Sequence, residues 1–379
     1  MKILFISTLQ DLWGGSEELW SKTALHALKE GHDICVLCYK HIRLPQHLRL
    51  IKDNGGHLIL RPNDLEILKG STIKRLYHRL KLETRSYSYF SKLNRFKPDV
   101  ILVNQGGAFN AAEDDKLFDF ITKTQVPYLL TNRLTSDNGI PELQTLDKGR
   151  ALYKKAKHVI FASENNKEAM QSKLLFELEN SCSLNSPLNL SNTKLVPFPI
   201  DTKTLNMACV ARLDVNYKGQ DILFKALATP EWLTRKWNLN LYGRGEHYEY
   251  LVALADYFGI SDRIKFHGHV ENISKVWQEN HIMILPSLEE GLPIALLECL
   301  ISGRPAIATA VAGNTEVIID GQTGYLIKGN NTLELQHALE RAWQNSSKWE
   351  NMGINAHDST LRKIDTSPEI KLLKMLTSV

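Results

Sequence analysis

The sequence predicts an α/β protein with two doubly wound parallel sheets in tandem, and three observations carry this prediction. The chain of 379 residues is longer than a single hydrophobic core usually supports. Short apolar runs alternate with helix-like patterns along the chain, which is typical of parallel sheets. The alternation breaks near the middle and then begins again. We therefore expect two Rossmann-like domains, each with its own core.

Short apolar runs mark the strands that we expect. In the first half they are Ile3–Ser7, Ile34–Tyr39, His57–Leu60, Val100–Asn104, Tyr128–Asn132, Val159–Ala162 and Lys194–Pro197. In the second half they are Leu205–Ala211, Leu239–Gly243, Ile264–Gly268, Ile282–Pro286, Pro305–Thr309 and Gly324–Ile327. Helical patterns in the first half cover Ser16–Lys29, Ile73–Leu93, Ala112–Lys123 and Ile140–Lys157.

The boundary between the two domains is expected in the segment Pro197–Asp201. Its two prolines fix an extended path and exclude a helix. We assign residues 1–198 to the first domain and 199–360 to the second, and expect a helical segment, 361–379, to pack back on the first. Residues Cys182–Asn192 are rich in Ser and Asn and predict a surface loop.

Composition indicates a globular protein of the cytoplasm. Hydrophobic residues make up 43% and charged residues 23% of the chain, which argues against disorder. No apolar stretch approaches the roughly 20 residues of a membrane span, and the first residues read as a strand, not a signal peptide. Cys35 and Cys38 form a C-x-x-C, but a strand would point them to opposite faces. With no second cysteine pair we expect reduced thiols and no zinc site.

Positive charge is concentrated in the first half of the chain. Residues 1–200 carry 28 Lys and Arg against 21 Asp and Glu, and the remainder carries 18 against 21, so the halves are +7 and −3. Residues 73–97 combine apolar and basic residues at helical spacing. Such a helix packs one face on its own domain or lies on the anionic inner face of a membrane. No nucleic-acid-binding motif accompanies it.

The most specific pattern is Glu289-Glu-Gly-Leu-Pro-Ile-Ala-Leu-Leu-Glu298, which follows the run Ile282–Pro286. Gly291 permits close approach of a ligand to the backbone, and Pro293 suits the first turn of a helix. Amides of Gly291 and Leu292 at a helix start would favour an anion. Glu298 lies in an otherwise apolar stretch and needs a partner if buried. A capped core helix with one acidic residue at its edge is the alternative interpretation.

Two further loops follow expected strands. Arg212 and Lys218 stand at the junction between the run Leu205–Ala211 and a helix, where a pair of cations could clamp a diphosphate. Gly14 and Gly15 follow the first strand, and their amides could approach a phosphate or a sugar oxygen. Surface cations and tight turns explain each feature taken singly. Neither a complete G-x-G-x-x-G nor a Walker motif occurs.

Taken together, these motifs resemble a known family. Residues 205–328 are similar to the donor-binding half of the retaining glycosyltransferases of family 4, which have the GT-B fold. The matching motifs are Ala-Arg-Leu-Asp-x3-Lys-Gly from Ala211, Tyr-Gly-Arg-Gly from Tyr242, Phe-His-Gly-His-Val from Phe266 and Glu-Gly-Leu-Pro-x4-Glu from Glu290. The first half matches more thinly, through Gly14-Gly-Ser-Glu17.

The resemblance implies a retaining transferase that moves a sugar from a nucleotide diphosphate sugar, UDP in preference to GDP. Its acceptor would be a glycan, a lipid-linked acceptor or a small molecule, as in cell-envelope or polysaccharide biosynthesis. The first domain would lie on the acceptor side and the second would bind the donor. Such enzymes use the leaving phosphate to help deprotonate the acceptor, so no protein nucleophile is required.

The resemblance also implies roles for particular residues. Arg212 and Lys218 would neutralise the diphosphate, with Gly14 and Gly15 against it from the first domain. Glu298 would bind the ribose hydroxyls and Glu290 the transferred sugar. Amides from Gly291 through Leu292 to Pro293 would serve the diphosphate or the sugar, and the backbone near Val270 would meet the base. We expect no cofactor and no metal, because no Asp-x-Asp occurs in the chain.

One departure from the family concerns the sugar side of the site. Family members often carry a histidine at a strand end of the first domain, and the corresponding ends here offer Asn104 and Asn132. Either is a candidate to supply the missing hydrogen bond. Two competing functions remain open at this point: a nucleotide-sugar epimerase of the same fold, and a catalytically weak nucleotide-sugar-binding module.

Overall fold

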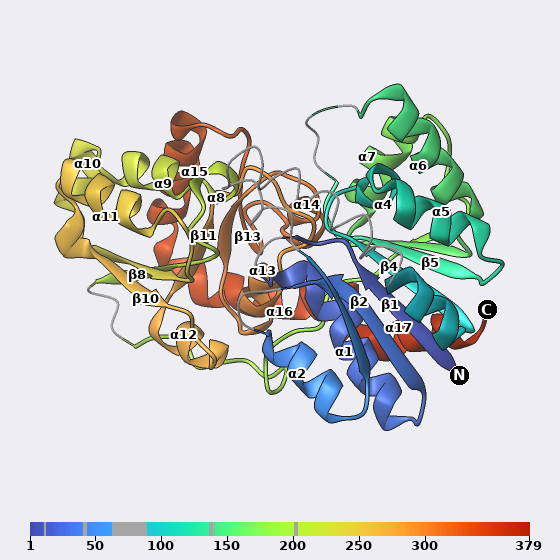
Figure 1. Ribbon diagram of the computed structural model, residues 1–379. Helices are drawn as coiled ribbons and strands as arrows, with labels where there is room; N and C mark the ends of the chain where they lie inside the picture. Colours follow the sequence, from blue (N-terminus) through green and yellow to red (C-terminus); the bar gives the residue numbers. More distant parts are fainter. Residues whose placement is uncertain (11–12, 41–43, 63–88, 136–138, 140, 201–203) are drawn as a thin grey trace. The chain divides into compact units, whose positions relative to one another are not determined.

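The computed structural model describes residues 1–10, 13–40, 44–62, 89–135, 139, 141–200 and 204–379 (Figure 1). They form two compact units, one of Met1–Pro187 with Ser367–Val379 and the other of Leu188–Thr366. Each unit is built on one parallel sheet with helices packed on it. The structure thus confirms the two parallel α/β sheets that the alternating pattern predicts.

The sheet of the first unit has seven parallel strands in the order β3-β2-β1-β4-β5-β6-β7. The order reverses between β1 and β4, and in open α/β sheets ligands bind at the carboxyl ends of strands beside such a reversal. The strands are β1 (Lys2–Ser7), β2 (Asp33–Tyr39), β3 (His57–Arg61), β4 (Val100–Gln105), β5 (Tyr128–Asn132), β6 (His158–Phe161) and β7 (Ser181–Ser183).

Helices bury an apolar core on each face of this sheet. Cys35 lies in the core of one face and Cys38 in that of the other, as the strand alternation predicts. Leu372 and Leu376 of the last helix pack into the same core as Trp20, and this helix lies beside the first α-helix and contacts β4 (Figure 1). The helices are η1 (Gly15–Glu17), α1 (Glu18–Lys29), α2 (Gln46–Asp53), α4 (Asn110–Glu113), α5 (Asp115–Lys123), α6 (Leu143–Lys155), α7 (Glu164–Leu174) and α17 (Pro368–Thr377).

The sheet of the second unit has six parallel strands in the order β10-β9-β8-β11-β12-β13. They are β8 (Leu205–Val210), β9 (Trp237–Tyr242), β10 (Ile264–Gly268), β11 (Ile282–Leu285), β12 (Ala306–Thr309) and β13 (Gly324–Ile327). The helices are α8 (Val215–Lys218), α9 (Gln220–Leu227), α10 (Pro230–Thr234), α11 (Tyr248–Tyr257), η3 (Ser261–Arg263), α12 (Ile273–Glu279), α13 (Ile294–Ile301), α14 (Asn314–Val317), α15 (Thr332–Gln344), η4 (Ser346–Lys348) and α16 (Trp349–Lys363).

One prediction near the junction is wrong, and another holds only in part. The run Lys194–Pro197 is not a strand, because proline lacks the N–H that a sheet ladder needs. Instead, the buried Arg304 guanidinium donates to the carbonyls of Val196 at 3.1 Å and of Pro197 at 2.5 Å. The segment Cys182–Asn192, predicted as a surface loop, begins in edge strand β7 and is buried at 184–187, and it is an exposed loop only at its end, at Asn189, Ser191 and Asn192.

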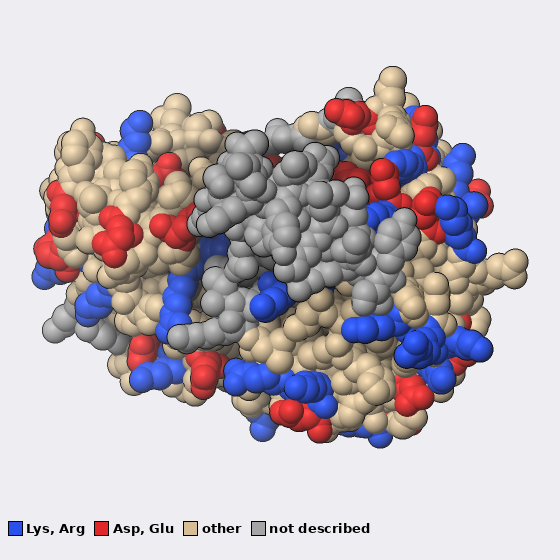
Figure 2. All heavy atoms as spheres, viewed as in Figure 1, with Lys and Arg blue, Asp and Glu red and all other residues tan. Residues whose placement is uncertain are grey.

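The basic segment 73–97 lies mostly outside the described residues, which leave out 63–88. Elsewhere on the visible face, basic and acidic side chains are interspersed (Figure 2). Within the part of the chain that the structure describes, no helix is both long enough and apolar enough to cross a bilayer.

Glycines allow the strand-end loops of the second unit to pack backbone against backbone. A β-carbon on Gly219 would lie 2.4 Å from the carbonyl oxygen of Pro286, and one on Gly243 would lie 2.0 Å from that of Ala211. Both glycines also have positive φ, +61° and +148°. The loops after β8, β9 and β11 are therefore held together at one edge of the sheet.

We expect Gly243→Ala to lower the free energy of unfolding by roughly 2–6 kcal/mol, because it adds a backbone clash to an unfavourable φ. Gly259→Ala is the matched control, since Gly259 has φ +65° but nothing within 4 Å of an added β-carbon. The control should lose only about 1–2 kcal/mol. Urea denaturation of both variants checks this, and equal losses would mean that the close approach is unimportant.

Candidate functional site

The residues that the sequence singles out in the second unit lie on loops at the carboxyl ends of its strands. Arg212 follows β8, and Lys218 ends the single turn of α8. Glu290 and Gly291 follow β11 and precede α13. In parallel sheets these ends share one edge, which is where ligands bind in this architecture.

Lys218 and Glu290 are joined directly. The Lys218 ammonium lies 2.6 Å from a carboxylate oxygen of Glu290, and the side chains are 19% and 10% exposed. A backbone hydrogen bond of 2.8 Å from Leu288 to Tyr217 brings the two loops together. Lys218, expected to bind the diphosphate, and Glu290, expected to bind the sugar, therefore form one ion pair, although 72 positions separate them in sequence.

Glu298 lies on α13 and is 3% exposed. Its carboxylate accepts a 2.7 Å hydrogen bond from the backbone N–H of Asn189. Pro293 stands at the N-cap of α13, beside Leu292. The carbonyl of Gly291 accepts from the N–H of Gly313 at 2.8 Å, so the turn is tied to the loop after β12.

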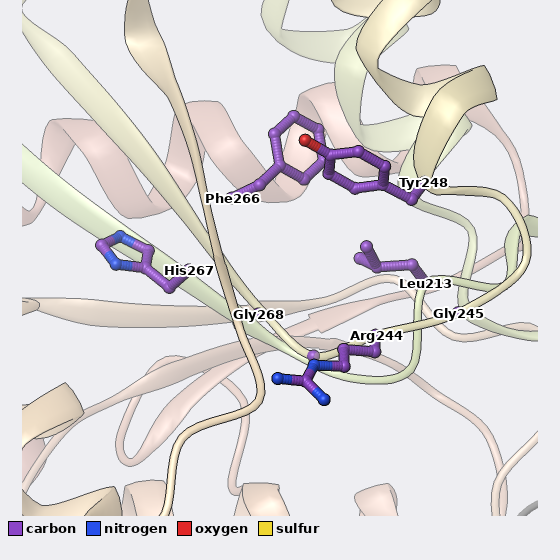
Figure 3. A pocket seen from close by; sticks show the side chains of 8 residues that line it. Leu213, Arg244, Gly245, Tyr248, Phe266, His267 and Gly268 are labelled. Atoms are coloured by element: carbon purple, nitrogen blue, oxygen red, sulfur yellow. The ribbon is translucent and has the colours of Figure 1, made fainter.

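A cavity of about 440 Å³ opens between the loops that follow β8, β9 and β10 (Figure 3). Tyr248 and Phe266 form an aromatic wall, with ring centroids 5.2 Å apart at 79°. Every lining residue except Tyr248 belongs to a motif that the sequence singles out, although the sequence assigned none of them to a cavity. The cavity is lined by Leu213, Gly243, Arg244, Gly245, Tyr248, Phe266, His267 and Gly268.

His267 is turned toward the protein and Val270 lies beyond the cavity. The His267 ring stacks on Tyr242 with centroids 4.4 Å apart, and its Nε2 lies 2.9 Å from the Asn240 side-chain oxygen. Burial lowers the pKa of His267, so the neutral ring is favoured. Val270 packs, partly buried, against the core on the α13 side of the sheet.

In the first unit, a buried polar network occupies the carboxyl ends of β1 and β4. Glu17, 2% exposed, accepts hydrogen bonds from Ser7 at 3.1 Å and from the Asn104 amide at 2.7 Å. Asn104 in turn accepts from Thr131 at 2.6 Å. The sequence shows Glu17 in the Gly14–Glu17 motif but gives it no role. Its place beside two glycines at a strand-to-helix junction was the available signal.

The structure places Asn104 and Asn132 inside the first unit. Asn104 is 2% exposed and Asn132 is fully buried, and the Asn132 amide donates to the Tyr153 hydroxyl at 3.1 Å. Both amides serve partners within the fold. Gly14 and Gly15 lie at the start of η1, where the N–H of Glu17 donates to the Gly14 carbonyl at 3.0 Å.

Known glycosyltransferases are similar to the second unit of this chain. The family model of the glycosyl transferases group 1 matches residues 204–345, within the second unit. An uncharacterised glycosyltransferase of Haemophilus influenzae is 29% identical over 48% of this chain and 50% of its own length. The D-inositol 3-phosphate glycosyltransferase of Corynebacterium diphtheriae is 29% identical over 42% of this chain and 38% of its own. Residues 204–345 of this chain are thus similar to the group 1 glycosyl transferases.

Solved structures agree on the fold. Anabaena HepE, solved in complex with UDP, has a TM-score of 0.74 at 17% identity over the whole of both chains. Sucrose-phosphate synthase of Thermosynechococcus elongatus has a TM-score of 0.75 at 15% identity, with 100% of this chain and 99% of the other covered. The fold class is therefore GT-B. The chain matches only about half the length, or less, of the two curated relatives named above.

The buried carboxyl group of Glu17 makes the stability of the first unit depend on pH. Burial raises the pKa of Glu17 from 4.5 to about 7, although the hydrogen bonds from Ser7 and Asn104 act to lower it. Between these two values the native state binds more protons than the unfolded chain. Stability is therefore lost as the pH rises from about 4.5 to about 7.

We expect Glu17→Gln to abolish this loss. Relative to the variant, the unsubstituted chain should lose up to about 1.4 kcal/mol of unfolding free energy per pH unit in that window. Chemical denaturation at several pH values measures it. Glu142→Gln, at an exposed position of the same unit, serves as the control. Parallel pH profiles for the unsubstituted chain and Glu17→Gln would contradict the assignment.

Proposed function

We propose that the chain is a retaining glycosyltransferase that moves a hexosyl group from a nucleotide diphosphate sugar, UDP in preference to GDP. The acceptor is a glycan, a lipid-linked molecule or a small molecule. The observation that carries the proposal is the set of charged side chains on loops at one edge of the second sheet. Two cations, Arg212 and Lys218, lie on the loop after β8, and the Lys218–Glu290 ion pair ties that loop to the one after β11.

The nature of the donor is supported by the solved structural neighbours. HepE has been solved with UDP and with UDP-glucose, and a variant of S. aureus TarM has been solved in a complex that includes UDP. Another structural neighbour is a galactosyltransferase of the lipopolysaccharide outer core. These proteins favour a UDP-hexose donor and, through the lipopolysaccharide enzyme, an acceptor of the cell envelope.

The chemistry follows from charge. Breaking the bond between sugar and diphosphate leaves negative charge on the phosphate and positive charge on the sugar ring. Arg212 and Lys218 would stabilise the first, and the Glu290 carboxylate would stabilise the second. Glu298, buried on α13, would bind the ribose hydroxyls. The leaving phosphate would take the acceptor proton, so the step uses no protein nucleophile and no metal.

We expect UDP to raise the melting temperature, because a ligand that binds only the native state stabilises it by mass action. Arg212→Ala or Lys218→Ala should remove most of the shift. Arg341→Ala, whose guanidinium pairs with Asp320 at 2.8 Å, is the control. Thermal unfolding with UDP, GDP and no nucleotide measures these effects, and unchanged shifts in both site variants would refute the diphosphate site.

Product analysis separates transfer from the competing functions. Incubation of UDP-sugars with and without candidate acceptors should give UDP release that an acceptor accelerates. A new free nucleotide sugar without acceptor would indicate an epimerase. Nucleotide binding with no turnover over a broad acceptor panel would indicate a binding module.

The two glutamates should differ in kinetics. Glu298→Gln removes a contact made equally in ground and transition states, so it should raise KM more than it lowers kcat. Glu290→Gln should lower kcat by about tenfold to a thousandfold, because a charged contact to the developing charge is worth about 1.5–4 kcal/mol. Nucleotide affinity should stay nearly intact, since Lys218 keeps its charge.

Steady-state turnover and UDP titration of both variants decide between these outcomes. Normal turnover by Glu290→Gln would show that the residue does not contact the reacting sugar. A loss of UDP affinity as severe as that of Glu298→Gln would show instead that Glu290 acts through Lys218.

A further inference from the structure

Arg212 combines a fixed backbone with a side chain that its surroundings hold weakly. Its carbonyl accepts hydrogen bonds from Gln220 at 2.7 Å and from the N–H of Asp214 at 2.9 Å. Its side chain is 41% exposed. A long exposed side chain samples many rotamers, and fixing it on a ligand costs up to about 2 kcal/mol. A group that restrains the guanidinium before the ligand arrives therefore reduces this cost and strengthens ligand binding.

Asp214 is placed to provide that restraint. It stands at the N-cap of α8, where aspartate usually accepts from an amide of the first turn, yet its side chain makes no such bond. One carboxylate oxygen lies 3.4 Å from the Arg212 guanidinium, and the other lies 3.7 Å from Nδ1 of His247. The residue is 5% exposed, and a buried carboxylate is stable only beside positive charge or donors.

The neighbouring loop fixes this geometry. Leu213 donates its N–H to the carbonyl of Arg244 at 3.1 Å and accepts at its own carbonyl from the N–H of His247 at 3.2 Å. These two backbone bonds set His247 beside Asp214, on a different loop from Arg212. His247 is 24% exposed, so solvent reaches it less than it reaches Arg212.

We propose that Asp214, backed by His247, is a positioning residue that holds the Arg212 guanidinium ready for the diphosphate of the donor. The inference rests on the proposed function. It explains why a carboxylate, which by charge alone would repel a diphosphate, lies buried beside a cation assigned to bind one. The benefit is a preorganised guanidinium, and His247 lies 3.7 Å from the carboxylate oxygen that does not face Arg212.

The same cluster offers a second chemistry, which the observations favour less. Donor atoms of Asp214, Glu246 and His247 lie within 4.8 Å of one another, and such nitrogen and oxygen ligands suit a divalent cation. The Arg212 guanidinium lies against the same carboxylate, however, and would repel the ion. Tight binding of a divalent cation would therefore contradict the positioning role of Asp214.

The test is a double-mutant cycle on UDP affinity, measured by isothermal titration calorimetry on the full chain. We expect Asp214→Asn to weaken UDP binding about tenfold, although it removes a negative charge. In the Arg212→Ala background the same substitution should change the Kd by less than about twofold. His247→Gln should show a smaller loss that also vanishes in that background. Asp320→Asn, which breaks the ion pair with Arg341, should leave the Kd unchanged.

Several results would overturn the inference. Unchanged or tighter binding by Asp214→Asn would show that the carboxylate does not position Arg212. An equal loss in both backgrounds would show a general effect on the loop, and His247→Gln provides the same comparison if Asp214→Asn fails to fold. Titration of Mn²⁺ or Zn²⁺ giving tight binding that Asp214→Asn abolishes would reassign the cluster to a cation. Absence of UDP binding by the unsubstituted chain would refute the proposed function itself.

Discussion

The second unit depends on loops that pack backbone against backbone at the carboxyl edge of its sheet. Gly219 lies against the carbonyl of Pro286, and Gly243 lies against that of Ala211. A side chain at either position would push neighbouring loops apart, because its β-carbon would overlap with the carbonyl oxygen that the glycine contacts. The proximity of Lys218 to Glu290 follows from this packing, because the loops that carry them are joined by the bond from Leu288 to Tyr217. Side-chain chemistry at this edge is thus a consequence of main-chain geometry.

That packing leaves each cation assigned to the diphosphate beside a carboxylate. Lys218 pairs with Glu290, and Arg212 pairs with Asp214. Such pairing lowers the net positive field that an anion meets, but it also removes rotamer freedom before the ligand arrives. Partly exposed ion pairs are worth little in themselves, so an incoming diphosphate, under the proposed function, would exchange one set of charged contacts for another at small cost. Its binding at this edge would then be governed by geometry more than by total charge.

The sequence predicted the strands and helices, which follow local patterns of apolar residues. It missed the contacts between residues that are far apart in the chain. Alternation of apolar runs and helical patterns located strands such as Asp33–Tyr39 and Ile282–Leu285, because burial in a parallel sheet requires continuous apolar residues. The edge strand Ser181–Ser183 has too few residues and too little apolar character to stand out. The contact of Asp214 with His247 joins residues 33 positions apart on separate loops, and no local pattern encodes it. The spacing of Glu290 and Glu298 was readable, since both flank one turn and one helix, but the partner of Glu290 was not.

The two units use polar groups at their strand ends in opposite ways. In the first, Ser7, Glu17 and Asn104 face one another inside the fold, and their hydrogen bonds are made by the protein. Opening this network would leave buried donors and acceptors unsatisfied, at about 1–3 kcal/mol for each. In the second, Lys218 and Glu290 remain 10–19% exposed, and Arg212 is exposed further, so water or a ligand can replace either partner. The carboxyl edge of the first sheet is therefore suited to hold a rigid loop at Gly14 and Gly15. The carboxyl edge of the second is suited to reorganise around a charged ligand, which is why the binding energy for a nucleotide is assigned there.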